Sequence, residues 1–250
     1  MSLPIDRIIE KLDEYLDKND LSGAERHLKY WLEEARQTKD FRGSFTILNE
    51  LVGFYRKTGK KEEAYSASSE ALKLVEDMEI TETVSAATAY INVATAYKSF
   101  GDWKKALSLY KKAKIIYEKN LENNDGRLGG LYNNMALCLT DAGDFDGALD
   151  LFNKALKVME LTVDGELEQA ITCLNIADLI EQRDGLEKGS DSISDLVSKA
   201  QELMQKPDIK KDGYFAFVAE KCIPGFKYYG FFAFAKELQE ICEKIRAGEK

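Results

Sequence analysis

The chain has 250 residues, of which 44% are hydrophobic and 32% are charged, and its formal net charge is −9 at pH 7. Nucleic-acid binding draws its affinity from an excess of lysine and arginine, so we expect no nucleic-acid partner. The sequence contains no apolar run near the 18–20 residues that cross a bilayer and no recognisable export signal, which predicts a cytoplasmic protein without membrane attachment. Three prolines among many Ala, Leu, Lys and Glu residues predict an all-α fold.

The prediction of paired helices starts from a turn that recurs along the sequence. Successive glycines 42 residues apart begin the segments Gly59-Lys-Lys-Glu-Glu-Ala64, Gly101-Asp-Trp-Lys-Lys-Ala106 and Gly143-Asp-Phe-Asp-Gly-Ala148. Glycine adopts the left-handed conformation that ends a helix, and an alanine five residues later lets two antiparallel helices approach closely. Each segment is therefore predicted to be a helix end, a tight turn and a new helix start.

Side chains on both sides of these turns agree with paired helices. Sets such as Tyr90-Val93-Ala94-Tyr97 precede the turn on one helical face, and small and large residues alternate after it, as in Ala106-Tyr110-Ala113. This pattern resembles the tetratricopeptide repeat. Its period of 42 exceeds the usual length of about 34, and similar lengthening occurs in kinesin light chains and bacterial peptide-sensing regulators. The resemblance implies a right-handed superhelical α-solenoid of about six antiparallel helix pairs, forming one domain over residues 1–250.

The expected repeats differ in regularity along the chain. In the first, Asn19 replaces the glycine of the turn, which asparagine's tolerance of the left-handed region allows. In the fifth, the Gly185–Ser192 link is expected to be looser than its counterparts. In the sixth, Pro224-Gly225 is expected to kink or break the first helix, and the repeat is expected to act as an aromatic-rich cap. The approximate boundaries are 4–38, 40–79, 82–121, 124–162, 166–206 and 210–247.

Asparagines recur on the first helices, which line the concave groove in solenoids of this type. Asn92, Asn134 and Asn175 each stand two residues before a small alanine, and Asn49 and Asn133 lie one residue earlier in their copies. In kinesin light chains and the peptide-sensing regulators, asparagines at this place hold the backbone of a bound peptide, and the resemblance implies the same role here. A carboxamide offers both a donor and an acceptor for that purpose. The alternative is that these asparagines bond neighbouring helices or solvent at the groove wall.

Charged residues near the same positions suggest a groove of two polarities, with cations toward the N-terminal half and carboxylates toward the C-terminal half. A groove of this kind would orient a peptide with its acidic end over the early repeats. The alternative is that several of these charges are solvated at the rim. Arg56 is the preferred candidate because arginine can bind a carboxylate through two parallel hydrogen bonds. The residues concerned are Arg56, Lys57, Lys98, Asp141, Asp178 and Glu181.

Aromatic residues are concentrated between Tyr214 and Phe234, too many for a single core stripe. One interpretation is an interface for a homodimer or a partner, where aromatic anchors concentrate binding energy. The other, which we prefer, is a cap whose rings close the end of the solenoid. The candidate interface residues are Phe226, Tyr228, Tyr229, Phe231 and Phe232.

No combination of residues indicates catalysis, a metal or a cofactor. The single histidine, His27, has no neighbouring nucleophile or ligand spacing and is expected to be an ordinary boundary residue. The four cysteines are widely spaced, which predicts reduced, mostly buried thiols. We therefore expect a non-catalytic scaffold that holds an extended peptide or protein segment in its groove. The alternatives are a homo-oligomerising structural module, or the sensor half of a peptide-responsive regulator.

Overall fold

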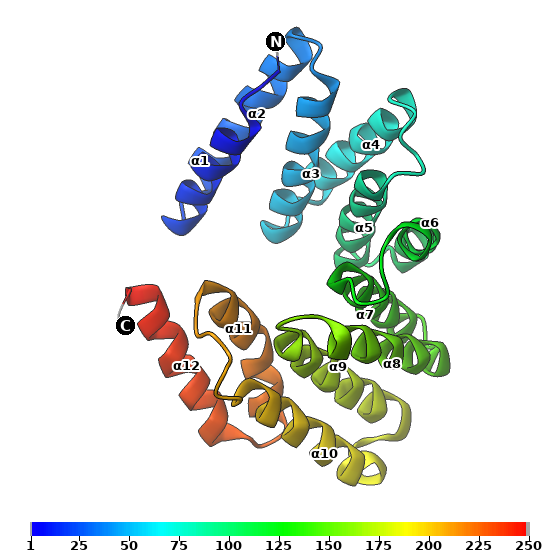
Figure 1. The fold of residues 1–250 in the computed structure, drawn as a ribbon, viewed down its shortest axis with the longest axis vertical. Helices are drawn as coiled ribbons and strands as arrows, with labels where there is room; N and C mark the ends of the chain where they lie inside the picture. The colour runs from blue at the N-terminus through cyan, green and yellow to red at the C-terminus, as the bar shows by residue number, and fades with distance from the viewer. Residues whose placement is uncertain (1, 249–250) are drawn as a thin grey trace. The chain divides into compact units, whose positions relative to one another are not determined.

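The computed structural model describes residues 2–248, which contain twelve α-helices and no strand. The helices form six antiparallel pairs, as the repeat pattern predicts (Figure 1). In chain order the pairs are α1 (Ile5–Asp17) with α2 (Leu21–Gln37), α3 (Phe41–Lys57) with α4 (Lys61–Asp77), α5 (Val84–Ser99) with α6 (Trp103–Asn120), α7 (Gly126–Asp141) with α8 (Phe145–Leu161), α9 (Glu166–Asp184) with α10 (Leu186–Met204), and α11 (Gly213–Tyr228) with α12 (Phe232–Ala247).

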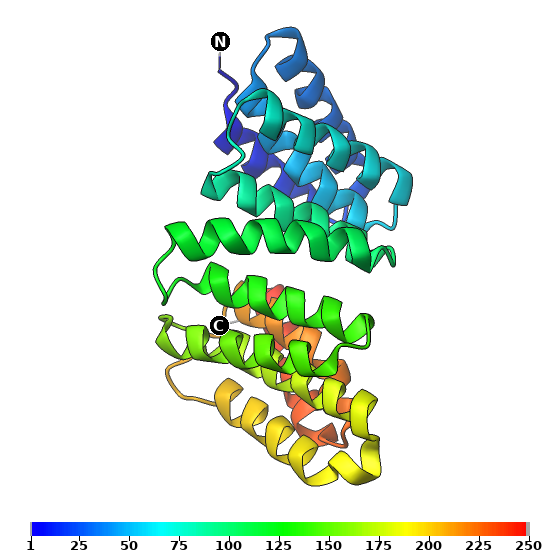
Figure 2. The same cartoon turned by 90° about the vertical axis from the view of Figure 1, so that its right-hand side faces the viewer.

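These pairs form two compact units, the first ending at Asn120 and the second starting at Leu121. Unit 1 contains α1 to α6, and unit 2 contains α7 to α12. Within each unit the helices lie side by side, as Figure 2 shows in a view turned by 90°. The single superhelical domain expected over residues 1–250 stays a prediction.

The turns between paired helices have the predicted left-handed residues. Gly59, Gly101 and Gly143 have φ angles of 73°, 87° and 80°, and Asn19 takes the same role with a φ of 53°. After each glycine, the next N–H donates to a carbonyl five residues earlier, which closes the helix end. These bonds, each 2.9 Å long, join Lys60 to Tyr55, Asp102 to Tyr97, and Asp144 to Leu139.

Buried alanines hold the two helices of a pair together. Ala64, Ala106 and Ala148, in the first turn of α4, α6 and α8, each have an exposed fraction of 0%. Between successive alanines the large Tyr110 and Phe152 are also fully buried. Small residues let the helix backbones approach, and the large ones fill the space left beside them. The alternation noted in the sequence is therefore the packing surface of each pair.

Helix starts carry a motif that the sequence analysis did not identify. An aspartate immediately before the helix accepts a hydrogen bond from the N–H of a glycine three residues later, which satisfies one of the open donors at the helix start. The pairs are Asp20 with Gly23 at 2.8 Å, Asp40 with Gly43 at 2.9 Å, and Asp144 with Gly147 at 3.1 Å.

The link between α9 and α10 is tight, so the expectation of a loose Gly185–Ser192 link is wrong. α9 ends at Asp184 and α10 begins at Leu186, with Gly185 alone between them at a φ of 83°. The second glycine, Gly189, is buried in α10, and a Cβ built on it would lie 2.7 Å from Cγ2 of Ile180. Gly189 therefore allows close contact between α9 and α10, and the stretch is helix rather than loop.

The expected break at Pro224 is also wrong, because α11 runs from Gly213 to Tyr228 with Pro224 inside it. Proline removes one helical N–H donor and leaves a carbonyl one turn earlier without its bond. Pro224 lies on the exposed side of the helix, where water can reach the backbone. Packing of the opposite, buried side keeps the helix continuous.

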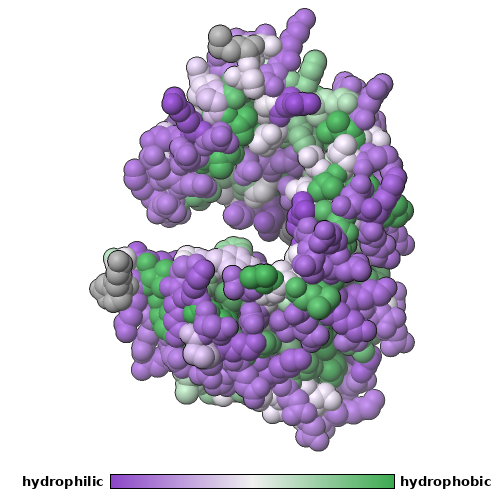
Figure 3. Space-filling view, in the orientation of Figure 1, coloured by the Kyte–Doolittle hydropathy of each residue, from purple (hydrophilic) through white to green (hydrophobic). Residues whose placement is uncertain are grey.

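The four cysteines are free and buried, as predicted. Burial raises the pKa of the Cys222 thiol to about 12, which keeps it protonated at neutral pH. Most of the surface seen in Figure 3 is hydrophilic, with hydrophobic residues in small patches. Within residues 2–248 we find no helix that combines the length and the apolar character needed to cross a bilayer.

Leucine in place of a packing alanine should separate the paired helices. We expect Ala106→Leu to lower the free energy of unfolding by about 1–3 kcal/mol, because the added carbons enter a filled space. Urea unfolding followed by circular dichroism measures this change. Ser108→Leu adds the same side chain at an exposed site of α6 and should change stability by less than about 0.5 kcal/mol. Equal losses in the two variants would contradict the close approach at Ala106.

Two helical glycines should respond in opposite ways to alanine. Gly130 in α7 has no atom within 4 Å of its Cβ position, so Gly130→Ala should stabilise the protein by about 0.5–1 kcal/mol. At Gly189 the new methyl group meets Ile180, and Gly189→Ala should instead destabilise the protein by about 1 kcal/mol. Thermal unfolding of both variants checks this, and stabilisation by Gly189→Ala would show that α10 has room to move.

Candidate functional site

In unit 1 the first helices α3 and α5 are joined by an amide pair. The Nδ2 of Asn92 donates to Oδ1 of Asn49 at 3.3 Å, and the Nδ2 of Asn49 donates to the carbonyl of Phe45 at 2.8 Å. Both asparagine side chains are half-buried. The Oδ1 of Asn92 and its second N–H have no partner among the hydrogen bonds of the described residues.

Unit 2 contains the same arrangement between α7 and α9. The Nδ2 of Asn175 donates to Oδ1 of Asn133 at 3.0 Å, and the hydroxyl of Thr172 donates to the same oxygen at 3.2 Å. The paired asparagines are 42 residues apart here and 43 apart in unit 1. Asn134 is half-buried and makes no side-chain hydrogen bond within the described chain. The bonds between neighbouring helices, which the sequence left open, thus use part of each amide and leave part of it available.

A carboxylate lies among the cations predicted for the first helices of unit 1. Arg56 and Lys98 are half-buried, on α3 and α5, and Lys57 is exposed. Glu50 of α3 occupies the position that Asn92 occupies in α5, and the sequence analysis missed it. Burial raises the pKa of Glu50 above its usual value, and the charge of Asp13 adds to the increase. Its place two residues before Val52, matching Asn92 before Ala94, was the available signal.

In unit 2, the hydroxyls of two tyrosines of α11, and of Tyr229 immediately after it, bind the carboxylates of α9. The Tyr229 hydroxyl lies 2.7 Å from Oδ1 of Asp178 and 2.9 Å from Oε2 of Glu181, and these two acceptors share its single proton. Tyr228 donates to the other oxygen of Glu181 at 2.5 Å, and Tyr214 donates to Glu168. These bonds join α9 to α11 and to the residue that follows it.

The environment of Asp178 makes its ionised form less favourable than it is in water. Desolvation by the packed protein atoms raises the pKa of this carboxyl above its usual value, and the nearby charge of Glu181 raises it further. Burial and the bond to Asp178 raise the pKa of Tyr229, so the phenol stays protonated and acts as the donor. The predicted groove residue Asp178 is thus bonded within unit 2 while it remains at the surface.

The aromatic interface candidates separate into core and surface residues. Phe226 is 0% exposed and packs edge-on against Phe234 with ring centroids 4.8 Å apart, so its assignment to an interface is corrected. Phe231 and Tyr229 are half-buried and pack on the same core. Tyr228 and Phe232 are 65% and 68% exposed and remain surface residues.

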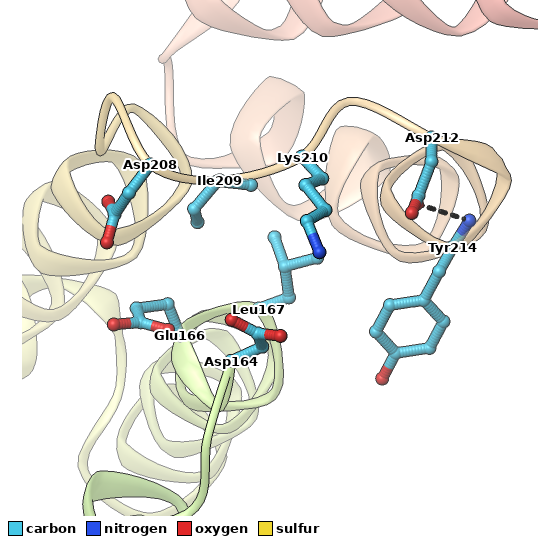
Figure 4. A pocket seen from close by; sticks show the side chains of 8 residues that line it. All are labelled: Asp164, Glu166, Leu167, Asp208, Ile209, Lys210, Asp212 and Tyr214. Atoms are coloured by element: carbon cyan, nitrogen blue, oxygen red, sulfur yellow. Dashed lines mark hydrogen bonds between the residues drawn. The ribbon is translucent and has the colours of Figure 1, made fainter.

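A cavity of about 150 Å³ lies where the α10–α11 connection passes the start of α9 (Figure 4). In Figure 4, Lys210 reaches from that connection toward Asp164 and Leu167. A second cavity of about 440 Å³ shares Asp164 and Tyr214 with it and extends to Glu168. No group of three or more His, Cys, Asp or Glu side chains in residues 2–248 is arranged to hold a metal ion. The first cavity is lined by Asp164, Glu166, Leu167, Asp208, Ile209, Lys210, Asp212 and Tyr214.

Comparison with known families identifies the repeat. Residues 43–119, which include almost all of α3 to α6, match the tetratricopeptide repeat family. This segment consists of tetratricopeptide repeats. Residues 131–157, in α7 and α8, match the PPR repeat family. No curated protein sequence is significantly similar to the chain.

Solved structures share the tetratricopeptide fold. BtubC (BKLC) from P. vanneervenii has a TM-score of 0.60 at 19% identity, covering 91% of this chain and 91% of that one. A protein described as a kinesin light chain with nearly identical TPR-like repeats, from Podosopora anserina, has a TM-score of 0.56 at 15% identity, covering 80% and 94%. A Rap protein in complex with Competence and Sporulation Factor has a TM-score of 0.64 at 15% identity, covering 99% and 66%. At these identities the likeness concerns the fold alone.

The charge of Asp178 should oppose folding over a defined pH range. Because its pKa is raised in the folded protein, the opposition is absent below the unfolded-state pKa of about 3.9, grows as the pH rises from there to the folded-state pKa, and is constant above it. Asp178→Asn removes the charge and keeps an oxygen that can accept from Tyr229.

Relative to Asp178→Asn, the wild type should therefore become less stable as the pH rises above about 4, the unfolded-state pKa of an aspartate. Urea unfolding across this range measures the difference. Asp195→Asn, at an exposed position of α10, should follow the wild type at every pH. A constant difference between wild type and Asp178→Asn would show that the Asp178 charge does not oppose folding.

Proposed function

We propose that this protein is a non-catalytic scaffold whose first helices bind an extended segment of a peptide or partner protein. The observation that supports it best is the asparagine pair, which recurs at the same place on consecutive first helices of both units. A recurring polar pair suits a ligand that itself repeats, and the peptide backbone presents one donor and one acceptor per residue.

The amide atoms left over by these pairs are the proposed contacts. Asn92 donates one N–H to Asn49, and Asn175 donates one N–H to Asn133. Asn134 donates none within the described chain. Each carboxamide can donate two hydrogen bonds and accept two more. Half-burial holds these side chains in place while it leaves them accessible. The free atoms can therefore pair with successive peptide groups without breaking the bonds between helices.

Backbone contacts alone cannot provide useful affinity. A net hydrogen bond contributes about 0.5–1.5 kcal/mol, whereas micromolar binding needs about 8 kcal/mol. Side-chain contacts must supply the remainder, and we propose the charged groups of the same helices for them. In unit 1 these are Arg56 and Lys98, and in unit 2 they are Asp178 and Glu181.

The fold is compatible with this role, since tetratricopeptide solenoids are suited to protein interaction. The Rap protein with a similar fold was solved in complex with Competence and Sporulation Factor. Neither likeness names a ligand for this chain, so the proposal depends on the amide groups described above.

Selection of short random peptides against the full chain, followed by fluorescence polarisation with an enriched peptide, tests the proposal. Asn134→Ala should weaken binding two- to tenfold, because one backbone hydrogen bond contributes about 0.5–1.5 kcal/mol. Its thermal stability should be unchanged, because Asn134 has no side-chain hydrogen bond to lose within the described chain.

Asn153→Ala provides the matched control, because it makes the same substitution at an exposed position of the second helix α8. It should bind like the wild type. Failure to enrich any peptide, or equal affinity of Asn134→Ala and wild type, would refute the asparagine-based site.

A further inference from the structure

One side of α11 presents an exposed stripe of large side chains. Tyr214, Phe217, Lys221, Pro224 and Tyr228 follow one another at spacings of three and four residues, which places them on one helical face. The residues Tyr214, Phe217 and Tyr228 are 49%, 47% and 65% exposed. Buried residues such as Phe215 and Phe226 occupy the opposite side. The exposed stripe is therefore separate from the hydrophobic core, and the core is complete without it.

These exposed rings are held in fixed positions. The Tyr214 and Phe217 rings are stacked, with centroids 6.4 Å apart and an interplanar angle of 27°, and the Lys221 ammonium lies 3.9 Å from the Phe217 centroid. The hydroxyls of Tyr214 and Tyr228 bind Glu168 and Glu181 of α9. Each tyrosine is thus anchored at its polar end while its ring stays accessible. Little ordering of these groups is needed when a ligand binds.

The neighbouring carboxylates carry charge without a compensating cation. Glu168, Asp178 and Glu181 form no ion pair with any lysine or arginine in the part of the chain that the structure describes. A tyrosine hydroxyl supplies a hydrogen bond but no charge, and a carboxylate accepts more than the one or two bonds found here. Together the rings and carboxylates form an acidic aromatic surface.

Guanidinium groups match both parts of such a surface. Arginine stacks its planar group on aromatic faces and binds carboxylates through two parallel hydrogen bonds. Apolar side chains beside the arginines can cover Phe217 and Tyr228. Anionic ligands, including phosphate backbones and acidic membranes, are repelled by the same carboxylates.

We propose that the acidic aromatic surface of α9 and α11 binds a segment of a partner protein in which arginines alternate with apolar residues. The inference rests on the proposed function, because α9 and α11 are first helices of unit 2, and it names the chemistry of the ligand. Arginines lie on the Tyr214 and Tyr228 rings and pair with Glu168 and Glu181. The intervening apolar side chains contact Phe217.

A labelled synthetic peptide that alternates arginine and leucine tests this directly against the full chain at near-physiological salt. A matched peptide that alternates glutamate and leucine is the ligand control. We expect the arginine peptide to bind and the glutamate peptide not to bind. Phe217→Ala and Glu181→Gln should each weaken binding about fivefold or more, because Phe217→Ala removes the apolar contact of the leucines and Glu181→Gln removes a charged partner of the guanidinium. Glu181→Gln keeps an oxygen for Tyr228, so the ring stays in place.

Two control variants separate this surface from general effects of charge and hydrophobicity. Asp195→Asn removes one negative charge from an exposed position of α10, and Ile115→Ala removes an apolar side chain that is 65% exposed on α6. Both should bind the arginine peptide as the wild type does. If Asp195→Asn weakens binding as much as Glu181→Gln, attraction is general and the proposal is wrong.

The outcomes for this inference and for the proposed function are distinguishable. Binding of the glutamate peptide in place of the arginine peptide, with loss in Asn134→Ala, would overturn the ligand chemistry and leave the asparagine site standing. Binding of the arginine peptide that depends on Phe217 but not on Asn134 would support the acidic aromatic surface alone. A stable dimer that Phe217→Ala dissociates in sedimentation would mean that a second copy covers α11, and would overturn the proposal.

Discussion

The close approach of antiparallel helices at buried alanines is the constraint on which the rest of the structure depends. Ala64, Ala106 and Ala148 have no exposed surface, and the left-handed turn just before each of them sets the angle at which the second helix returns. Because each pair buries one side against the next, the spacing between consecutive first helices is set as well. That spacing is short enough for asparagines 42 or 43 residues apart to bond directly.

The asparagine pairs connect this packing to the proposed binding role. A half-buried amide that bonds only another amide keeps unused donors and acceptors, and these are stabilised when a ligand supplies partners for them. The same side chain can therefore hold two helices together and bind a backbone, provided that its partner leaves some of its atoms free. Asn134, without a side-chain bond in the described chain, is available in full, whereas Asn49 also bonds the Phe45 carbonyl and is largely occupied.

Between α9 and α11 of unit 2, the side-chain bonds are of another kind than the asparagine pairs. Tyrosine hydroxyls on carboxylates bridge the two helices there, so the bond between first helices carries negative charge and aromatic surface rather than neutral amides. Desolvation raises the pKa of Asp178, and the nearby charge of Glu181 raises it further, so the ionised form of Asp178 lowers the stability of the folded protein. An incoming guanidinium relieves that repulsion, so the same arrangement that opposes folding favours a basic ligand. The two units thus share an architecture and differ in the ligand chemistry that their first helices offer.

The amino-acid sequence by itself determined the six helix pairs, the left-handed turns, including Asn19, and the first-helix positions of the asparagines, because these follow from local backbone preference and helical period. The tertiary structure alone decided which groups bond, since Asn175 meets Asn133, and Tyr229 meets Asp178, only after helices distant in the chain have packed. It also separated buried Phe226 from exposed Tyr228 and made the Gly185 link tight. Composition suggested an aromatic surface and a loose link at these places. Burial instead depends on which neighbour covers a residue, and that neighbour lies one repeat away.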